Sequence, residues 1–196
     1  MPSPLRKTSL VALALLALLG LSACGESRSK VTNGTYAGES GKNAPYLDVG
    51  PLTYEVQLSR ELNPVNTEDS TYLQGLTPAQ KALAPGQEWF AVFLQVYNNE
   101  HKEALPSASD ISITDTQDNT YLPIEPGESN QYAYRATLVP GNGQIPLPNS
   151  VAAAGPTQGA LLLFKVQVVS LDNRPLTIKI VAPGDPSETA SAELDV

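Results

Sequence analysis

Hydrophobic and polar residues alternate along much of the chain after residue 45. In the first clear example the apolar residues occupy every second position: Leu52, Tyr54, Val56 and Leu58. Alternation with a period of two is typical of a strand that buries one face. Similar patterns predict further strands over residues 87–97, 111–114, 120–124, 132–138, 159–169, 176–181 and 192–196. The pattern thus predicts about seven or eight strands, an all-β fold.

Residues 62–86 separate the first two strong strands, a connection too long for an ordinary loop in a compact domain. Thr77-Pro78-Ala79-Gln80 has the form of a helix N-terminal capping box, and Pro85-Gly86 ends the segment. We therefore expect one short helix in this long loop. The chain has 17 prolines and 14 glycines, which favour short strands and turns. The predicted fold is therefore an antiparallel β-sandwich, with an up-and-down barrel as the alternative.

The strand predicted over 87–97 is apolar on both faces. Phe90 and Val92 belong to one face, while Trp89, Phe93 and Tyr97 lie on the other. A strand of this kind is usually central in its sheet and covered on both sides, and residues 62–86 could provide the second cover. The alternative is that Trp89, Phe93 and Tyr97 form an exposed interaction surface.

The N-terminus has the three parts of a secretory signal peptide. Arg6 and Lys7 precede an uninterrupted apolar run over residues 10–19, and small residues follow. A membrane-spanning helix needs about 20 apolar residues, so this run is too short to cross a bilayer comfortably. We assign residues 1–23 to the signal peptide.

The segment Leu21-Ser22-Ala23-Cys24 resembles the lipobox of bacterial lipoproteins. The resemblance implies that Cys24 receives a diacylglyceryl group and becomes the mature N-terminus, which would hold the protein on the outer face of the cytoplasmic membrane. A free thiol in a secreted chain is the alternative. Residues 24–45, rich in Gly, Ser, Asn and charge, then read as a flexible tether, and residues 46–196 as the folded domain.

Charge argues against nucleic acid as a partner. Without residues 1–23, which hold two basic side chains and no acid, 10 basic and 20 acidic side chains remain, a formal charge of −10. Such a surface repels nucleic acid and anionic headgroups, so acyl chains must supply any membrane attachment. Cys24 is the only cysteine, so the domain is expected to hold together without a disulfide.

Few residues suit catalysis or metal binding, and we expect no catalytic residue, no metal and no cofactor besides the diacylglycerol. The single histidine, His101, lies among charged residues. No Gly-x-Ser-x-Gly, Ser-x-x-Lys or P-loop motif occurs. Two carboxylate pairs, Glu68 with Asp69 and Asp115 with Asp118, could serve as acid and base or as calcium ligands, but turn formation is the simpler interpretation of the second pair.

The order of several segments resembles a known family. They are TYEVQLSRELNP, EDSTYLQGL, GQEWFAVFLQVYN, ITDTQDNTYLP, GPTQGALLLFKV and NRPLTIKI. Together they are similar to uncharacterised actinobacterial lipoproteins with an immunoglobulin-like domain, and to a bacterial domain of unknown function related in fold to a secreted mycobacterial immunogenic antigen. The resemblance implies that the predicted antiparallel β-sandwich is immunoglobulin-like and lies at the cell surface, and it implies no assigned catalytic residue.

Three functions are compatible with these observations. The first is a non-enzymatic interaction domain that binds an envelope protein or wall polymer. The second is a carbohydrate-binding module with aromatic stacking platforms, for which the candidates are Trp89, Phe93, Tyr97, Tyr132 and Tyr134. The third, a hydrolase with a carboxylate pair, is the least favoured.

Overall fold

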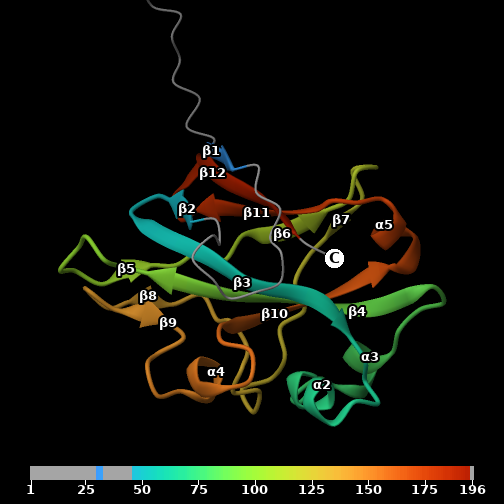
Figure 1. Cartoon of the computed structure of the whole chain (residues 1–196). Helices are drawn as coiled ribbons and strands as arrows, with labels where there is room; N and C mark the ends of the chain where they lie inside the picture. The colour runs from blue at the N-terminus through green and yellow to red at the C-terminus, as the bar shows by residue number, and fades with distance from the viewer. Residues whose placement is uncertain (1–29, 33–45, 195–196) are drawn as a thin grey trace, which may run out of the picture.

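The computed structural model describes residues 30–32 and 46–194, and two β-sheets packed face to face dominate it (Figure 1). One sheet has the order β10-β4-β3-β2, and β9 pairs with the end of β4. Its strands are β2 (Tyr46–Val49), β3 (Leu52–Leu62), β4 (Gln87–Tyr97), β9 (Gln144–Ile145) and β10 (Ala160–Gln167). The other sheet has the order β1-β12-β11-β6-β7. Its strands are β1 (Lys30–Thr32), β6 (Ile111–Thr114), β7 (Thr120–Tyr121), β11 (Leu176–Ala182) and β12 (Asp185–Leu194).

Two separate sheets confirm the predicted all-β sandwich and show that the barrel alternative is wrong. Every strand pair is antiparallel except β1 with β12. The described residues form 12 strands, more than predicted. Most of the difference comes from very short strands, including the separate pair β5 (Leu105–Pro106) and β8 (Leu138–Val139). A period-two pattern cannot reveal a strand of two residues.

The alternating apolar residues form the main core between the sheets. Tyr54, Val56, Phe90 and Phe164 from the first sheet are fully buried against Ile178 and its neighbours from the second. Because successive side chains of a strand point to opposite faces, the same strands also expose a second face of the first sheet. That face carries its own apolar residues, so it needs a separate cover.

Two short helices lie in the 62–86 connection, where one was predicted. Helix α3 (Pro78–Lys81) begins with the expected capping box, in which Thr77 and Gln80 exchange hydrogen bonds. Helix α2 (Thr67–Tyr72) was missed, although Asn66 caps it by accepting the backbone N–H groups of Glu68 and Asp69. An asparagine followed by acidic residues is a typical helix start. Two further short helices, α4 (Val151–Ala154) and α5 (Val168–Asp172), flank β10.

Several predicted strands differ in the structure. Residues 120–124 form only the short β7 and an isolated bridge from Ile124 to Leu163, and the strand predicted over 192–196 begins already at Asp185. Residues 132–138 make only an isolated bridge, from Ala133 to Leu161, before β8 begins. The predicted strand over 159–169 leaves the sheet at Gln167, and Val168 and Val169 enter α5 with 48% and 58% of their surface exposed. Apolar residues at these positions therefore do not mark buried strand positions.

Part of the segment predicted as a tether belongs to a sheet. Lys30–Thr32 forms β1, which pairs in parallel with Ala190–Ala192 of β12. A free sheet edge presents unpaired N–H and C=O groups, and β1 satisfies them over three residues. The predicted signal peptide, the lipobox residues Leu21, Ser22 and Ala23, and Cys24 lie outside the described residues.

Two buried tyrosine hydroxyls hold Ala108, which follows β5, against the core. Tyr54 Oη accepts the N–H of Ala108 at 2.7 Å, and Tyr134 Oη donates to the Ala108 carbonyl, also at 2.7 Å. Burial raises the pKa of Tyr54 to about 12, although the hydrogen bond from Ala108 lowers it in part. Both hydroxyls therefore stay neutral and act as structural hydrogen-bonding groups.

Replacing Tyr54 with phenylalanine is expected to reduce the free energy of unfolding by about 1 to 2 kcal/mol, because the buried N–H of Ala108 loses its acceptor. Urea unfolding followed by fluorescence measures the change. The control is Tyr46→Phe, since Tyr46 is 61% exposed, and that variant should unfold like the wild type. Equal stability of both variants would contradict the role given to the Tyr54 hydroxyl.

Candidate functional site

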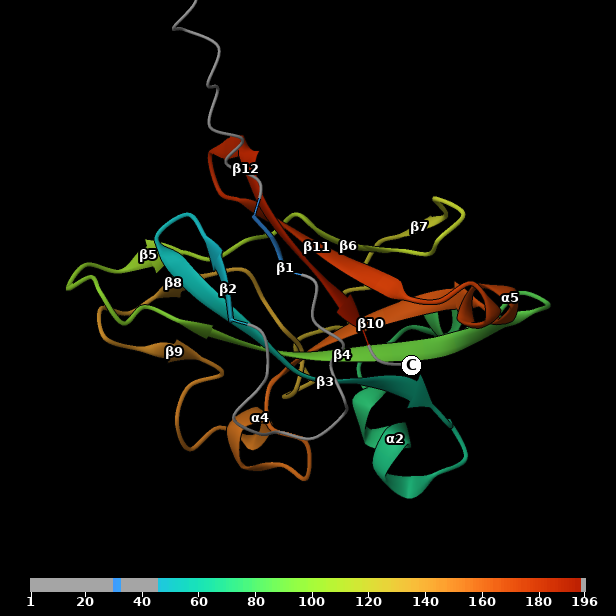
Figure 2. The same cartoon turned by 45° about the horizontal axis from the view of Figure 1, so that its top comes forward.

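The aromatic residues proposed as an exposed interaction surface lie mainly in the interior. Trp89 and Phe93 are 2% and 0% exposed, and Tyr97 is half-buried. Helix α2 and the residues after it cover this face of the sheet, and α2 lies beside β3 and β4 in both views (Figures 1 and 2). The exposed-surface interpretation is therefore wrong for Trp89 and Phe93, and the alternative, a cover supplied by residues 62–86, is confirmed.

The same burial removes most of the predicted sugar-stacking platforms. Tyr134 is 8% exposed, with its hydroxyl bonded inside the domain. Tyr132 packs edge-on against Tyr72 at a centroid distance of 5.0 Å. Tyr97 donates its hydroxyl proton to the Glu55 carboxylate at 3.0 Å. Burial raises the pKa of Tyr97 most, and the hydrogen bond to Glu55 raises it further. An aromatic platform for a sugar ring needs an open ring face, which the buried Trp89, Phe93 and Tyr134 do not offer.

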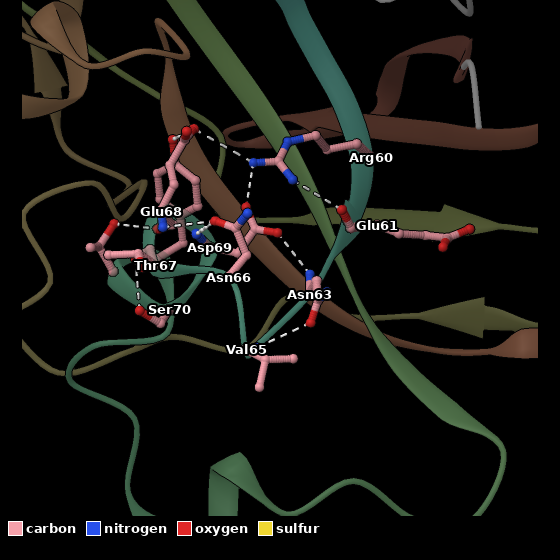
Figure 3. Close-up of polar contacts among 11 residues, drawn as sticks. Arg60, Glu61, Asn63, Val65, Asn66, Thr67, Glu68, Asp69 and Ser70 are labelled. Carbon is pink, nitrogen blue, oxygen red and sulfur yellow. Dashed lines mark hydrogen bonds and ion pairs between the residues drawn. The ribbon is translucent and has the colours of Figure 1, made fainter.

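Both members of the first carboxylate pair, Glu68 and Asp69, form ion pairs with Arg60 (Figure 3). Arg60 Nη2 lies 2.5 Å from Asp69 Oδ1, and Asp69 Oδ2 accepts the backbone N–H of Asn63 at 2.7 Å. Glu68 lies 3.7 Å from the same guanidinium and accepts the hydroxyl of Tyr72 at 3.2 Å. These contacts fasten α2 to the end of β3.

Electrostatics agree with a structural role for Asp69. Burial raises the pKa of its carboxyl, but the hydrogen bonds from Arg60 and Asn63 and the charge of Arg60 outweigh burial, so the pKa lies below its usual value. A general acid at neutral pH needs a raised pKa. Asp69 is therefore an ionised anchor for α2 and is unsuited to donating a proton.

The second pair, Asp115 and Asp118, forms a turn, as the simpler interpretation held. Asp115 accepts the backbone N–H groups of Gln117 and Asn119 at 2.9 and 3.0 Å, and Asp118 has a positive φ of 64°. His101 is exposed. Within residues 46–194 no group of three or more His, Cys, Asp and Glu side chains could hold a metal ion.

An apolar hollow of about 370 Å³ lies beside α4, between residues 131–138 and residues 145–152. Its buried lining comes from Ile145, Pro146, Ala152 and Ala160. Leu138 and Leu147 belong to the same lining and are 60% and 59% exposed. Large aliphatic side chains beside a hollow are typical of a surface that binds a partner.

Hydrogen bonds to the backbone fix both sides of the hollow. On one side, β9 pairs with the end of β4, Ser150 caps α4 at the N–H of Ala153, and Gly159 donates to the Ala152 carbonyl at 3.0 Å. On the other side the buried Asn130 amide is fully used. It donates to the carbonyls of Tyr72 and Gln74 and accepts the N–H groups of Tyr132 and Ala133. The hollow is therefore preformed.

The charged side chain that lines this hollow is Arg135, and no aspartate or glutamate lines it. Arg135 Nη2 donates to the carbonyls of Pro126 and Gly127 at 3.1 and 2.8 Å, which fixes the guanidinium plane. In the part of the chain that the structure describes, Arg135 forms no ion pair. An unpaired cation thus stands beside an apolar surface.

The sequence did not predict this hollow, because no helix or strand was expected between residues 138 and 159. The sequence contains one indication of an exposed apolar residue here. Leu147 lies between Pro146 and Pro148, so it cannot belong to the interior of a regular helix or strand that would bury it. The face of the hollow formed by residues 131–137 had no such signal, because its position depends on distant contacts of Asn130.

No protein-family model and no curated protein matches the chain. Two solved structures are similar at 9% identity. The yjhA protein from Bacillus subtilis has a TM-score of 0.48, covering 81% of this chain and 99% of that one. An uncharacterised β-sandwich protein from Clostridium difficile 630 has a TM-score of 0.42, covering 83% and 97%. Among the residues described here, no helix has the length and apolar character needed to span a bilayer.

Proposed function

We propose that the protein is an extracytoplasmic lipoprotein whose domain binds an envelope partner without catalysing a reaction. The observation that carries this proposal is the preformed apolar hollow with Leu138 and Leu147 exposed in its lining. Two other observations support it. The Glu68–Asp69 pair is bound to Arg60, and Asp115 is committed to a turn. A protein partner is favoured over a wall polysaccharide, since Trp89, Phe93 and Tyr134 are buried.

The same proposal includes the location of the protein, at the outer face of the cytoplasmic membrane. Its support is the lipobox-like segment Leu21-Ser22-Ala23-Cys24 after a basic and then apolar N-terminus. A diacylglyceryl group on Cys24 would anchor the domain at the outer face of the cytoplasmic membrane. The proposed kinship with actinobacterial lipoproteins that carry an immunoglobulin-like domain rests on this segment and on the order of the strand motifs.

Replacing Cys24 with serine is expected to move the protein from the membrane fraction to the soluble fraction, because serine cannot form the thioether to the lipid. Cell fractionation and immunoblotting measure the shift. Ser22→Ala is the control, since it keeps a small residue beside an intact Cys24, and this variant should stay in the membrane fraction. Retention of Cys24→Ser in the membrane would contradict lipid anchoring.

A photo-crosslinking residue at position 147 tests the binding surface on intact cells. We expect p-benzoylphenylalanine at Leu147 to capture a distinct partner band, because position 147 lines the hollow. The control is the same residue at Leu122, which is 66% exposed but does not line the hollow. Equal capture from both positions, or capture of lipid alone from Leu147, would contradict binding at the hollow.

A further inference from the structure

We propose that the hollow beside α4 takes an extended peptide segment of a partner protein, with an aliphatic or aromatic side chain close to an Asp or Glu carboxylate. This inference rests on the proposed function, because it takes the hollow as the binding surface and specifies its occupant. Three features of the hollow define that occupant: its apolar lining, Arg135 without an ion pair to any described residue, and the polar side chains around it.

The lining selects an apolar side chain. Ile145, Pro146, Ala152 and Ala160 present no charged group to the hollow, and Leu138 and Leu147 extend the apolar surface into solvent. The hollow, of about 370 Å³, exceeds the volume of a single large side chain. It can therefore take one anchoring side chain together with part of the backbone beside it. Burial of such an anchor and of both leucines supplies the main driving force.

Arg135 selects a carboxylate. Two hydrogen bonds from Nη2 to backbone carbonyls hold its guanidinium in place, while Nε and Nη1 have no hydrogen-bond partner among the described residues. An arginine has five donors arranged in a plane that matches a carboxylate. Because the Arg135 side chain is already held in place, binding a carboxylate requires little further ordering of that side chain and therefore costs little affinity.

The charge distribution strengthens this selection. Without residues 1–23 the chain has 20 acidic and 10 basic side chains, so its net charge repels a carboxylate. The lining of the hollow has no Asp or Glu and contains Arg135. An acidic group on a partner is consequently attracted by Arg135 beside the hollow, while the net negative charge of the chain opposes its approach elsewhere on average.

A peptide fits the surrounding polar groups better than a free acyl chain does. Gln131, Thr137 and Ser150 also line the hollow, and the side chains of Gln131 and Thr137 form no hydrogen bond with a described residue. Peptide N–H and C=O groups can use these donors and acceptors, whereas hydrocarbon cannot. An apolar centre with hydrogen-bonding groups around it is the usual arrangement of a protein–protein interface.

A selection from a random heptapeptide library displayed on phage tests the proposal. The target is the purified full chain in phosphatidylcholine nanodiscs, which keep free detergent away from the hollow, and empty nanodiscs serve as the blank. We expect enriched peptides to share an apolar residue within two positions of Asp or Glu. The best peptide is then synthesised with its acidic residue intact and with the matching amide, and binding is measured by fluorescence anisotropy.

Two substitutions locate the peptide. Leu147→Ser is expected to weaken binding of both synthetic peptides by about tenfold or more. Arg135→Gln should weaken the acidic peptide by about tenfold and leave the amide peptide within about twofold, whereas Arg135→Lys should retain part of the preference. Thermal melts of each variant verify that the domain remains folded.

The outcomes separate this inference from the proposed function. Peptides sensitive to Leu147→Ser that lack an acidic residue, or that are indifferent to Arg135→Gln, would overturn the acidic segment and leave the hollow as a binding surface. Peptides insensitive to Leu147→Ser, or no enrichment over empty nanodiscs, would overturn both. Decanoate competing for the hollow more strongly than the peptide would assign it to free acyl carboxylates and also overturn the inference.

Discussion

Replacing Phe93 with alanine is expected to lower the free energy of unfolding by about 3 to 5 kcal/mol. Phe93 is fully buried in the second apolar cluster, where its ring meets Tyr72 edge-on at a centroid distance of 5.1 Å. Alanine would leave a cavity between β4 and α2, and both would lose contacts that fix the cover. Urea unfolding monitored by circular dichroism measures the change.

Leu122→Ala is the matched control, because Leu122 is 66% exposed and its truncation should change stability by less than about 0.5 kcal/mol. A loss below about 1 kcal/mol for Phe93→Ala would contradict a tightly packed second cluster.

Replacing Asp69 with alanine is expected to cost about 2 to 3 kcal/mol at pH 7. The substitution removes the acceptor of Arg60 and of the Asn63 N–H, both at the junction of β3 and α2. The cost lies below that of a fully buried ion pair because the Arg60 side chain is 30% exposed and keeps some water. Urea unfolding of Asp69→Ala and Asp69→Asn beside the wild type measures it.

The same contacts predict a pH dependence. Because the pKa of Asp69 is lower in the folded protein than in the unfolded chain, the ionised carboxylate stabilises the fold above the unfolded value of about 3.9. That stabilisation is lost as the pH falls through the folded pKa. The stability difference between wild type and Asp69→Asn should therefore be constant from pH 7 to 5 and shrink below about pH 4. A difference that stayed constant down to pH 2 would contradict the lowered pKa.

The sandwich could be predicted because its central strands bury residues in a regular order. The alternation from Leu52 to Val56 and the doubly apolar segment from Trp89 to Tyr97 both correspond to long strands, β3 and β4. Leu58 was expected on the same face as Val56, but the strand register shifts between these two residues and Leu58 packs, half-buried, against the second apolar cluster. The capping box at Thr77 was equally informative, because all its hydrogen bonds are local in sequence. Local patterns succeed where the stabilising contacts are local or strictly periodic.

The candidate site could not be predicted, because it depends on contacts between distant residues. Asn130 reaches Tyr72 and Gln74, more than 50 positions away, and this sets one face of the hollow. Burial of Trp89 likewise depends on α2, which an ion pair joins to Arg60. The apolar pattern favoured a covered strand but left the exposed interpretation open. A polar residue in a loop does not disclose its distant partner.

Strand β1 alters how far the domain could stand from a membrane. A fully extended chain covers at most about 3.6 Å per residue, so an anchor at Cys24 followed by a free segment up to Tyr46 would allow about 80 Å. If Cys24 is lipidated as proposed, then with Lys30–Thr32 paired to β12 only the residues between Cys24 and Lys30 would separate the anchor from the domain, and the maximum distance would fall to about 20 Å. The three residue pairs between β1 and β12 would then determine whether the domain lies close to the lipid surface or samples a much larger volume around its anchor.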